Sequence, residues 1–307
     1  MTERKITNLP ASIRQRLLQV ARASNRPFQE VLQYYAMERF LFRLSVSPHV
    51  EKFILKGALM MTAWGAPATR PTRDIDLLGY VPNHVESLVE IIREVCCQEV
   101  EPDALSFDPT TATGIVIKAD ADYEGVRVTF RGSLQNMPIP MQIDIGFGDI
   151  VFPAPTITEY PVILNHARPK LRGYSRETTV AEKFEAMIKL GLLNSRMKDF
   201  FDIWLLSRQF DFDGATLVEA IQKTFSNRGT TITAEPTAFS AEFATDAGKV
   251  SQWQAFVRKL RWEGESQDLA SVCKAIAMFL SPPTAAALEG HPFRGLWRNA
   301  GPWTDAD

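Results

Sequence analysis

The segment Arg73-Asp74-Ile75-Asp76-Leu77 decides the fold, because polar and apolar residues alternate along it. That period of two is typical of a β-strand, and it places Asp74 and Asp76 on one face and Ile75 and Leu77 on the other. Two neighbouring carboxylates repel each other, so the pair is expected to bind a cation if the strand end is partly buried. Carboxylate oxygens suit Mg²⁺ or Mn²⁺. A pair of solvated acids at a strand end is the alternative.

Further strands are predicted on both sides of this segment. Upstream, Phe53–Leu55 forms a short strand, and Gly57 separates it from a helix over 58–64. Backbone N–H groups at such a turn favour a triphosphate. Downstream, β-branched or alternating residues divided by Gly or Pro predict three antiparallel strands, at 114–119, 126–131 and 141–145. These strands extend the sheet that holds Asp74.

The last of these strands carries a third carboxylate, Asp144, between Ile143 and Ile145. A carboxylate in apolar surroundings is costly unless it is paired or bound to a metal. Three carboxylates on neighbouring strands can hold two divalent ions about 3.5 to 4 Å apart, the arrangement used in nucleotidyl transfer. Strand register decides whether Asp144 is a ligand or lies behind the ligands, because a slip of one residue inverts its direction.

Helical periodicity dominates the two ends of the chain. Near the N-terminus it predicts helices over 10–23, 28–44 and 83–98. In the second half it predicts helices over 178–193, 197–208, 214–225, 249–260 and 268–280. We therefore expect an α/β (α+β) fold, with a mixed sheet and flanking helices in residues 1–165 and a helical domain in residues 166–307.

Composition narrows the class of protein. The 307 residues carry 34 basic and 36 acidic side chains and are 45% apolar, which is ordinary globular composition. No stretch reaches the ~18 apolar residues of a membrane span, and the N-terminal residues lack the apolar region of a secretory signal. The three cysteines form neither a disulfide framework nor a zinc-binding pattern. We expect a cytoplasmic protein.

A basic stretch comprises His166, Arg168, Lys170, Arg172 and Arg176. Two interpretations stay open for it: contact with RNA phosphates, and a solvated loop.

Four blocks of sequence together carry a family resemblance. They occur in the order Leu55-Lys56-Gly57-Ala58, Arg70-Pro71-Thr72-Arg73-Asp74-Ile75-Asp76, Ile143-Asp144-Ile145, and Ala181-Glu182-Lys183 followed by Arg196-Met197-Lys198-Asp199-Phe200-Phe201-Asp202. The set resembles the AbiEii/AbiGii toxin family, a branch of the nucleotidyltransferase superfamily that includes the MenT toxins. The resemblance spans about half of the chain, from residue 53 to residue 205.

The resemblance implies both an activity and roles for residues. It implies transfer of NMP from an NTP to an acceptor hydroxyl, on tRNA in some members, with Mg²⁺. It also implies a toxin restrained by an AbiEi-like antitoxin in a type IV system. Asp74 and Asp76 would hold metal, Lys183 and Arg196 would bind the NTP phosphates, and Asp199 would orient the acceptor hydroxyl. Asp202 is either the partner of Asp199 or a helix-packing carboxylate, and Lys183 taken alone is typical of a solvated lysine.

The sequence departs from the family pattern after the glycine, where Ser or Gly is usual and Ala58 stands here. Alanine offers no hydroxyl to a phosphate, so Lys56, Gly57 and Ala58 would bind it through backbone and charge. Arg70 and Thr72 either supply the missing contact or shape a proline-containing turn. Two other functions stay open: a binding module with a degenerate nucleotide site, and transfer to a protein or small molecule.

Overall fold

The computed structural model describes residues 8–66, 71–120, 123–261 and 268–305. The chain divides into two compact units. Unit 1 comprises Met1–Gly65, Pro71–Gly148 and Thr156–Gly173, and unit 2 comprises Ala66–Arg70, Asp149–Pro155 and Tyr174–Asp307. The main division falls after Gly173 and not at residue 165, because the segment before it completes a sheet in unit 1.

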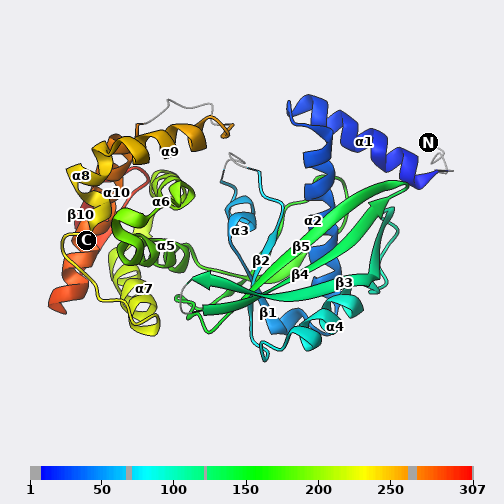
Figure 1. The fold of residues 1–307 in the computed structure, drawn as a ribbon, viewed down its shortest axis with the longest axis horizontal. Helices are drawn as coiled ribbons and strands as arrows, with labels where there is room; N and C mark the ends of the chain where they lie inside the picture. Colours follow the sequence, from blue (N-terminus) through cyan, green and yellow to red (C-terminus); the bar gives the residue numbers. More distant parts are fainter. Residues whose placement is uncertain (1–7, 67–70, 121–122, 262–267, 306–307) are drawn as a thin grey trace. The chain divides into compact units, whose positions relative to one another are not determined.

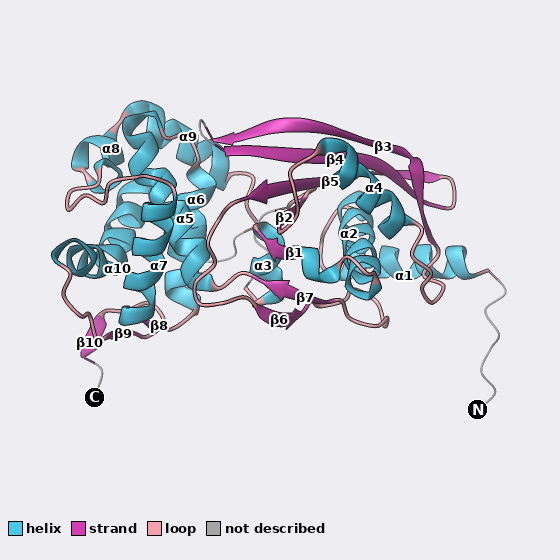
Figure 2. Cartoon of the chain, turned by 90° about the horizontal axis from the view of Figure 1, so that it is seen from below, coloured by secondary structure: helices cyan, strands magenta, loops and turns pink. Residues whose placement is uncertain are grey.

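Unit 1 is built on a mixed sheet with the strand order β3-β4-β5-β2-β1-β7-β6. Strands β1 to β5 are labelled in Figure 1, and β6 and β7 in Figure 2. The strands are β1 (Phe53–Lys56), β2 (Ile75–Gly79), β3 (Leu105–Asp120), β4 (Tyr123–Leu134), β5 (Met137–Phe147), β6 (Thr156–Glu159) and β7 (Lys170–Gly173). The expected α/β fold is confirmed. Strands β6 and β7 were not predicted, since they are short and lie in a proline-spaced connection.

The strands β3, β4 and β5 form the expected antiparallel meander, and each is longer than its apolar residues indicated (Figure 1). A two-residue turn at Gln135–Asn136 joins β4 to β5, with Leu134 paired to Met137. Strand β5 then pairs with β2 in parallel, and β2 pairs with β1 in antiparallel orientation. Strand β2, which carries Asp76 and begins directly after Asp74, is therefore central in the sheet.

Helices α2 (Phe28–Val46), α3 (Ala58–Ala63) and α4 (Val85–Cys96) pack against this sheet. Helix α1 (Leu9–Ala23) packs against α2. Helix α4 packs against β3 and β4, and α2 packs against β5 and β7. A side chain at Gly114 would collide with Val85 and Val89 of α4, so Gly114 and its partner Val128 face this helix. Residues that alternate with Val128 along β4 therefore face the other side of the sheet.

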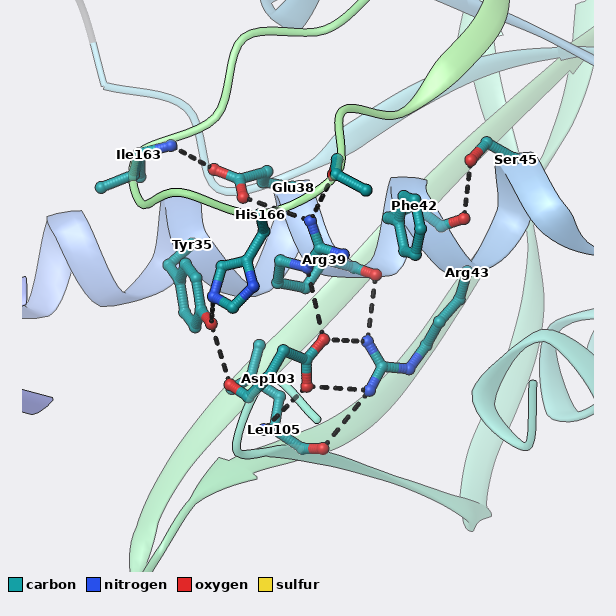
Figure 3. Close-up of polar contacts among 11 residues, drawn as sticks. Tyr35, Glu38, Arg39, Phe42, Arg43, Ser45, Asp103, Leu105, Ile163 and His166 are labelled. Atoms are coloured by element: carbon teal, nitrogen blue, oxygen red, sulfur yellow. Dashed lines mark hydrogen bonds and ion pairs between the residues drawn. The ribbon is translucent and has the colours of Figure 1, made fainter. Parts of the chain in front are cut away.

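Helix α2 is buried together with charged residues, which hydrophobic periodicity could not predict (Figure 3). Arg43 donates to both oxygens of Asp103, over 2.6 and 3.1 Å, and Arg39 pairs with the same carboxylate. The N–H of Ile163 donates to Glu38 over 2.7 Å. Burial raises the pKa of Glu38 to about 7. This network fastens α2 to the loops around residues 103 and 163.

Unit 2 is mainly helical, as expected. Its helices are α5 (Arg176–Leu190), α6 (Met197–Gln209), α7 (Gly214–Asn227), α8 (Ala241–Thr245), α9 (Ala247–Val257) and α10 (Leu269–Glu289). A small sheet was not predicted; it joins β8 (Phe212–Asp213), β9 (Gly295–Trp297) and β10 (Trp303–Asp305) (Figure 2). Arg228 at the end of α7 pairs with Asp149 over 2.7 Å, which ties residues 149–155 to this unit.

Helix α10 runs past the expected end at Leu280 and through Pro282 and Pro283. Proline removes a helical N–H, so the carbonyl of Phe279 loses its partner and instead accepts a hydrogen bond from the indole N–H of Trp303 over 2.8 Å. The resulting helix is long and apolar enough, by length and composition alone, to cross a membrane. Half of its most apolar window is buried inside the protein, as in an ordinary core helix.

Candidate active site

The strand register of unit 1 places four charged residues in one row across the sheet. Lys56 pairs with Asp76, Asp76 with Asp144, and Asp144 with Arg127. Arg127 alternates with Val128, so the row lies on the face opposite α4. The ammonium of Lys56 reaches across toward Gly146, the second residue after Asp144, and adds a positive charge to this face.

The two carboxylates of this row meet a third, that of Asp74, which directly precedes β2. One oxygen from each of Asp74, Asp76 and Asp144 lies within 4.8 Å of the others, and all three residues are half-buried. Hard oxygen donors at this separation fit a divalent ion such as Mg²⁺ or Mn²⁺. The structure thus brings together the three residues that the sequence predicted as metal ligands.

Thr72 holds the first of these carboxylates. Its hydroxyl donates to Asp74 Oδ1, and its backbone N–H donates to the hydroxyl of Tyr34 on α2 over 3.0 Å. Thr72 is buried. Its hydroxyl therefore orients Asp74 in this structure, and a direct contact of Thr72 with a phosphate stays a prediction. Arg70, the other residue expected there, lies outside the described residues.

Gly57 is required where it stands for two separate reasons. Its φ is +69°, a left-handed conformation that L side chains rarely adopt. A Cβ on Gly57 would lie 2.0 Å from Oδ2 of Asp76, so only glycine lets this carboxylate reach its position. Ala58 begins helix α3, which has only six residues. So short a helix has a weak dipole, and the close approach of Asp76 explains Gly57 better than a helix dipole does.

Sequence reasoning missed Arg127, which makes a bidentate contact with Asp144 in the row. Its Nε and Nη2 donate to the two oxygens of Asp144 over 2.8 and 2.7 Å. This bidentate hydrogen bond, together with the charges of Asp74 and Asp76, raises the pKa of Arg127 above its ordinary value. The amide of Gln142 also donates to Asp144, at 3.3 and 3.4 Å. Both oxygens of Asp144 are thus engaged by this protein's own groups.

A second cluster of predicted residues lies in unit 2. The ammonium of Lys183 on α5 pairs with Asp199 over 2.7 Å and with Asp202 over 2.9 Å. Arg196 pairs with the other oxygen of Asp199 over 2.8 Å. Asp199 and Asp202 are 1% and 3% exposed. Lys183 is therefore not a solvated lysine, and Asp202 belongs to this cluster as well as to the packing of α6.

Local structure explains how this cluster is positioned. Ser175 caps α5 by accepting from the N–H of Thr178, so the helix carries Lys183 two turns later. Asn194, fully buried before α6, accepts from the N–H of Arg196 over 2.8 Å. Its carbonyl accepts from Lys249 of α9 over 2.8 Å. Asn194 and Lys249 were not predicted, because only the fold places α9 beside this loop.

The basic stretch is not an unopposed strip. Strand pairing places Glu159 of β6 beside β7, where it pairs with Lys170 over 2.9 Å and with Arg168 over 3.7 Å. His166 contacts the hydroxyl of Tyr35 over 3.0 Å. The stretch is also divided between units, because Arg176 begins α5 in unit 2. These contacts weaken the case for RNA binding at this stretch.

Comparison with known proteins places the chain in a family. Residues 39–276 match the family described as "Nucleotidyl transferase AbiEii toxin, Type IV TA system". Two crystal structures of Helicobacter pylori proteins are similar in fold. JHP933 is 14% identical, with a TM-score of 0.47, and the match covers 85% of this chain and 93% of JHP933. A protein provisionally called a nucleotidyltransferase is 15% identical, with a TM-score of 0.45, and the match covers 85% of this chain and 96% of that protein. No curated protein matches the chain. The family match covers most of the sequence, and the chain belongs to the AbiEii nucleotidyl transferase toxin family of type IV toxin-antitoxin systems.

Proposed function

We propose that this protein is a metal-dependent nucleotidyltransferase that moves NMP from an NTP to an acceptor hydroxyl, with tRNA as the acceptor. One observation carries the proposal: Asp74, Asp76 and Asp144 meet within 4.8 Å on a central part of the sheet. A divalent ion held there would neutralise charge on the phosphates during transfer. The family supplies the reaction class.

Asp74 and Asp76 are the proposed metal ligands in unit 1. Thr72 keeps Asp74 in place, and the absence of a side chain at Gly57 makes room for Asp76. The phosphates are assigned to Lys56 and to the backbone at Gly57 and Ala58. In support of this, Lys56 pairs with Asp76 and lies on the same sheet face. A hydroxyl at position 58 is not needed for binding through charge and backbone.

The proposed roles in unit 2 come from the family pattern and from the ion pairs. Lys183 and Arg196 are assigned to the NTP phosphates. Asp199 contacts both of these cations and is 1% exposed, so we assign it as a positioning residue that acts through them. Asp202 supports Lys183 in the same way.

The partner and the setting also follow from the family. A toxin of a type IV system is encoded with an antitoxin, so we propose an AbiEi-like antitoxin as its cellular counterpart. We further propose that the protein acts in the cytoplasm, where both NTPs and tRNA are present.

The test is transfer of label by the purified full chain. The protein is incubated with Mg²⁺, total tRNA and each α-labelled NTP in turn, beside the Asp76→Asn variant. Asp108→Asn is the matched control, because it removes an exposed carboxylate on β3 of the same sheet. We expect label in tRNA with one or two of the nucleotides, loss of label in Asp76→Asn, and full activity in Asp108→Asn.

Other outcomes redirect or refute the proposal. Label in protein and not in RNA would replace tRNA with a protein acceptor. Nucleotide binding without release of pyrophosphate would indicate a binding module. Transfer retained by folded Asp76→Asn would refute the assignment of the site.

A further inference from the structure

The contact between Arg127 and Asp144 bears on how many metal ions the site can hold. A carboxylate that bridges two ions offers an oxygen to each of them. In this structure both oxygens of Asp144 accept from the guanidinium of Arg127, at 2.8 and 2.7 Å, and both lie within reach of the Gln142 amide. Such a bidentate, charge-assisted pair is among the strongest polar contacts in proteins.

We propose that Arg127 takes the place of a second divalent ion. The site then holds a single divalent ion, ligated by Asp74 and Asp76, and Asp144 serves as the anchor of Arg127. This inference rests on the proposed function, because it assumes that Asp74 and Asp76 bind a divalent ion. It replaces the two-ion arrangement that three neighbouring carboxylates alone would suggest.

The charges on this sheet face support one ion. Within the cluster around the carboxylates, Asp74, Asp76 and Asp144 contribute three negative charges and Lys56 and Arg127 two positive ones, which leaves a net charge of −1 for the cluster. One divalent ion brings the cluster to +1. A second ion would bring it to +3, at about 3.5 to 4 Å from the first, and would also face the guanidinium of Arg127.

The geometry supports the same conclusion. Arg127 is paired with Asp144 through the register of β4 and β5, so its backbone position is fixed by the sheet and not by a mobile loop. Its side chain is 37% exposed and that of Asp144 is 17% exposed, so Arg127 is the more exposed partner of the pair. A second ion would therefore need to displace the guanidinium from Asp144.

The first experiment counts ions directly. The full chain is titrated with Mn²⁺ alone and followed by electron paramagnetic resonance, and the titration is repeated with the α,β-methylene analogue of each NTP. We expect one Mn²⁺ per chain with the spectrum of an isolated ion in both conditions. A magnetically coupled pair, as two ions about 3.5 to 4 Å apart would give, would overturn the proposal, and so would binding of no ion.

Two variants test the role of Arg127 itself. Arg127→Met exposes Asp144, so we expect a second Mn²⁺ and a coupled spectrum. Arg131→Met is the matched control, because this exposed arginine lies on the same face of β4 and pairs with Pro140, away from Asp144. It should keep one isolated ion. A single isolated ion in Arg127→Met would contradict the proposal; thermal unfolding checks that each variant is folded.

The double variant Arg127→Met/Asp144→Asn separates a ligand from an anchor. It removes one positive and one negative charge, so the net charge of the face is unchanged. Affinity for the one ion should stay within about threefold if Asp144 is the anchor of Arg127, and should fall by at least about tenfold if Asp144 is a ligand. Label transfer is measured in parallel. One bound ion without transfer to any acceptor would refute the proposed function but not this inference. Transfer with two bound ions would refute this inference but not the proposed function.

Discussion

Replacing Gly57 with alanine should damage both the fold and the metal site, for reasons that can be separated. The alanine must adopt a φ of +69° and a ψ of −151°, a backbone region that is essentially confined to glycine and costs other residues about 1 to 3 kcal/mol. Its Cβ would lie 2.0 Å from Oδ2 and 2.6 Å from Cγ of Asp76. Since no real Cβ contact is that short, the carboxylate of Asp76 must move.

The collision adds to the backbone strain. Forcing an extra methyl group into a packed site costs typically 1 to 3 kcal/mol, so the total for Gly57→Ala is about 2 to 6 kcal/mol. In a unit of this size that corresponds to a fall of roughly 4 to 24 °C in melting temperature. The displaced Asp76 should also lower the affinity for Mn²⁺ by at least about tenfold. Thermal unfolding and Mn²⁺ titration measure the two effects.

Gly65 provides a control within the same unit. Its φ is +78°, and a Cβ there would meet nothing within 4 Å. Gly65→Ala should therefore lose only about 1 to 2 kcal/mol to backbone strain and keep its affinity for Mn²⁺. If Gly57→Ala and Gly65→Ala lost the same stability and the same affinity, Gly57 would not be making room for Asp76, and the geometry of the site would be wrong.

Three further predictions follow from individual contacts. Thr72→Val removes the hydroxyl that holds Asp74 and should weaken Mn²⁺ binding about tenfold or more. Thr113 is an exposed threonine on β3, so Thr113→Val should leave Mn²⁺ binding unchanged in the same titration. Lys183→Met leaves two buried carboxylates without their shared cation and should lower the unfolding free energy by about 3 to 5 kcal/mol. Lys198 is exposed, so Lys198→Met should lower it by less than about 0.5 kcal/mol. Equal losses would mean that the cluster is not a buried ion-pair network. Because the pKa of Glu38 rises from 4.5 to about 7 on folding, the folded state binds the extra proton between these values, so unfolding free energy should fall by about 3 kcal/mol as pH rises through that window. Glu38→Gln should flatten this slope in pH-dependent denaturation, and an unchanged slope would assign the titration to another group.

The register of the central hairpin was within reach of the sequence. Leu134 and Met137 close a two-residue turn at Gln135–Asn136, where Gln135 has a φ of +54°. A two-residue turn fixes every pair along both strands, and counting outward from it places Arg127 opposite Asp144. Alternation alone identified the strands and the acidic residues. The turn was the missing signal, and it would have revealed the partner of Asp144.

Other parts of the site depend on contacts that no local pattern encodes. The hydroxyl of Tyr34 meets Thr72 across 38 residues of sequence, and Lys249 meets Asn194 across 55. The buried charges of α2 are similar, because Arg43 looks like a surface residue until Asp103 is placed beside it. Periodicity reports which side of an element is apolar. It does not report which distant group compensates a buried charge.

The three carboxylates of unit 1 are each held by a different kind of constraint, and this difference predicts how the site should tolerate change. Asp74 is held by a side-chain hydroxyl from Thr72, Asp76 by the empty space at Gly57, and Asp144 by the two N–H groups of Arg127. The first two constraints position an oxygen, and neither Thr72 nor Gly57 supplies a positive charge. The third supplies a full positive charge. Metal affinity should therefore depend on Thr72 and Gly57 through geometry, which salt does not screen, and on Arg127 through charge, which salt does. Loss of Arg127 should matter less at high ionic strength, whereas loss of Thr72 or Gly57 should matter equally at every salt concentration.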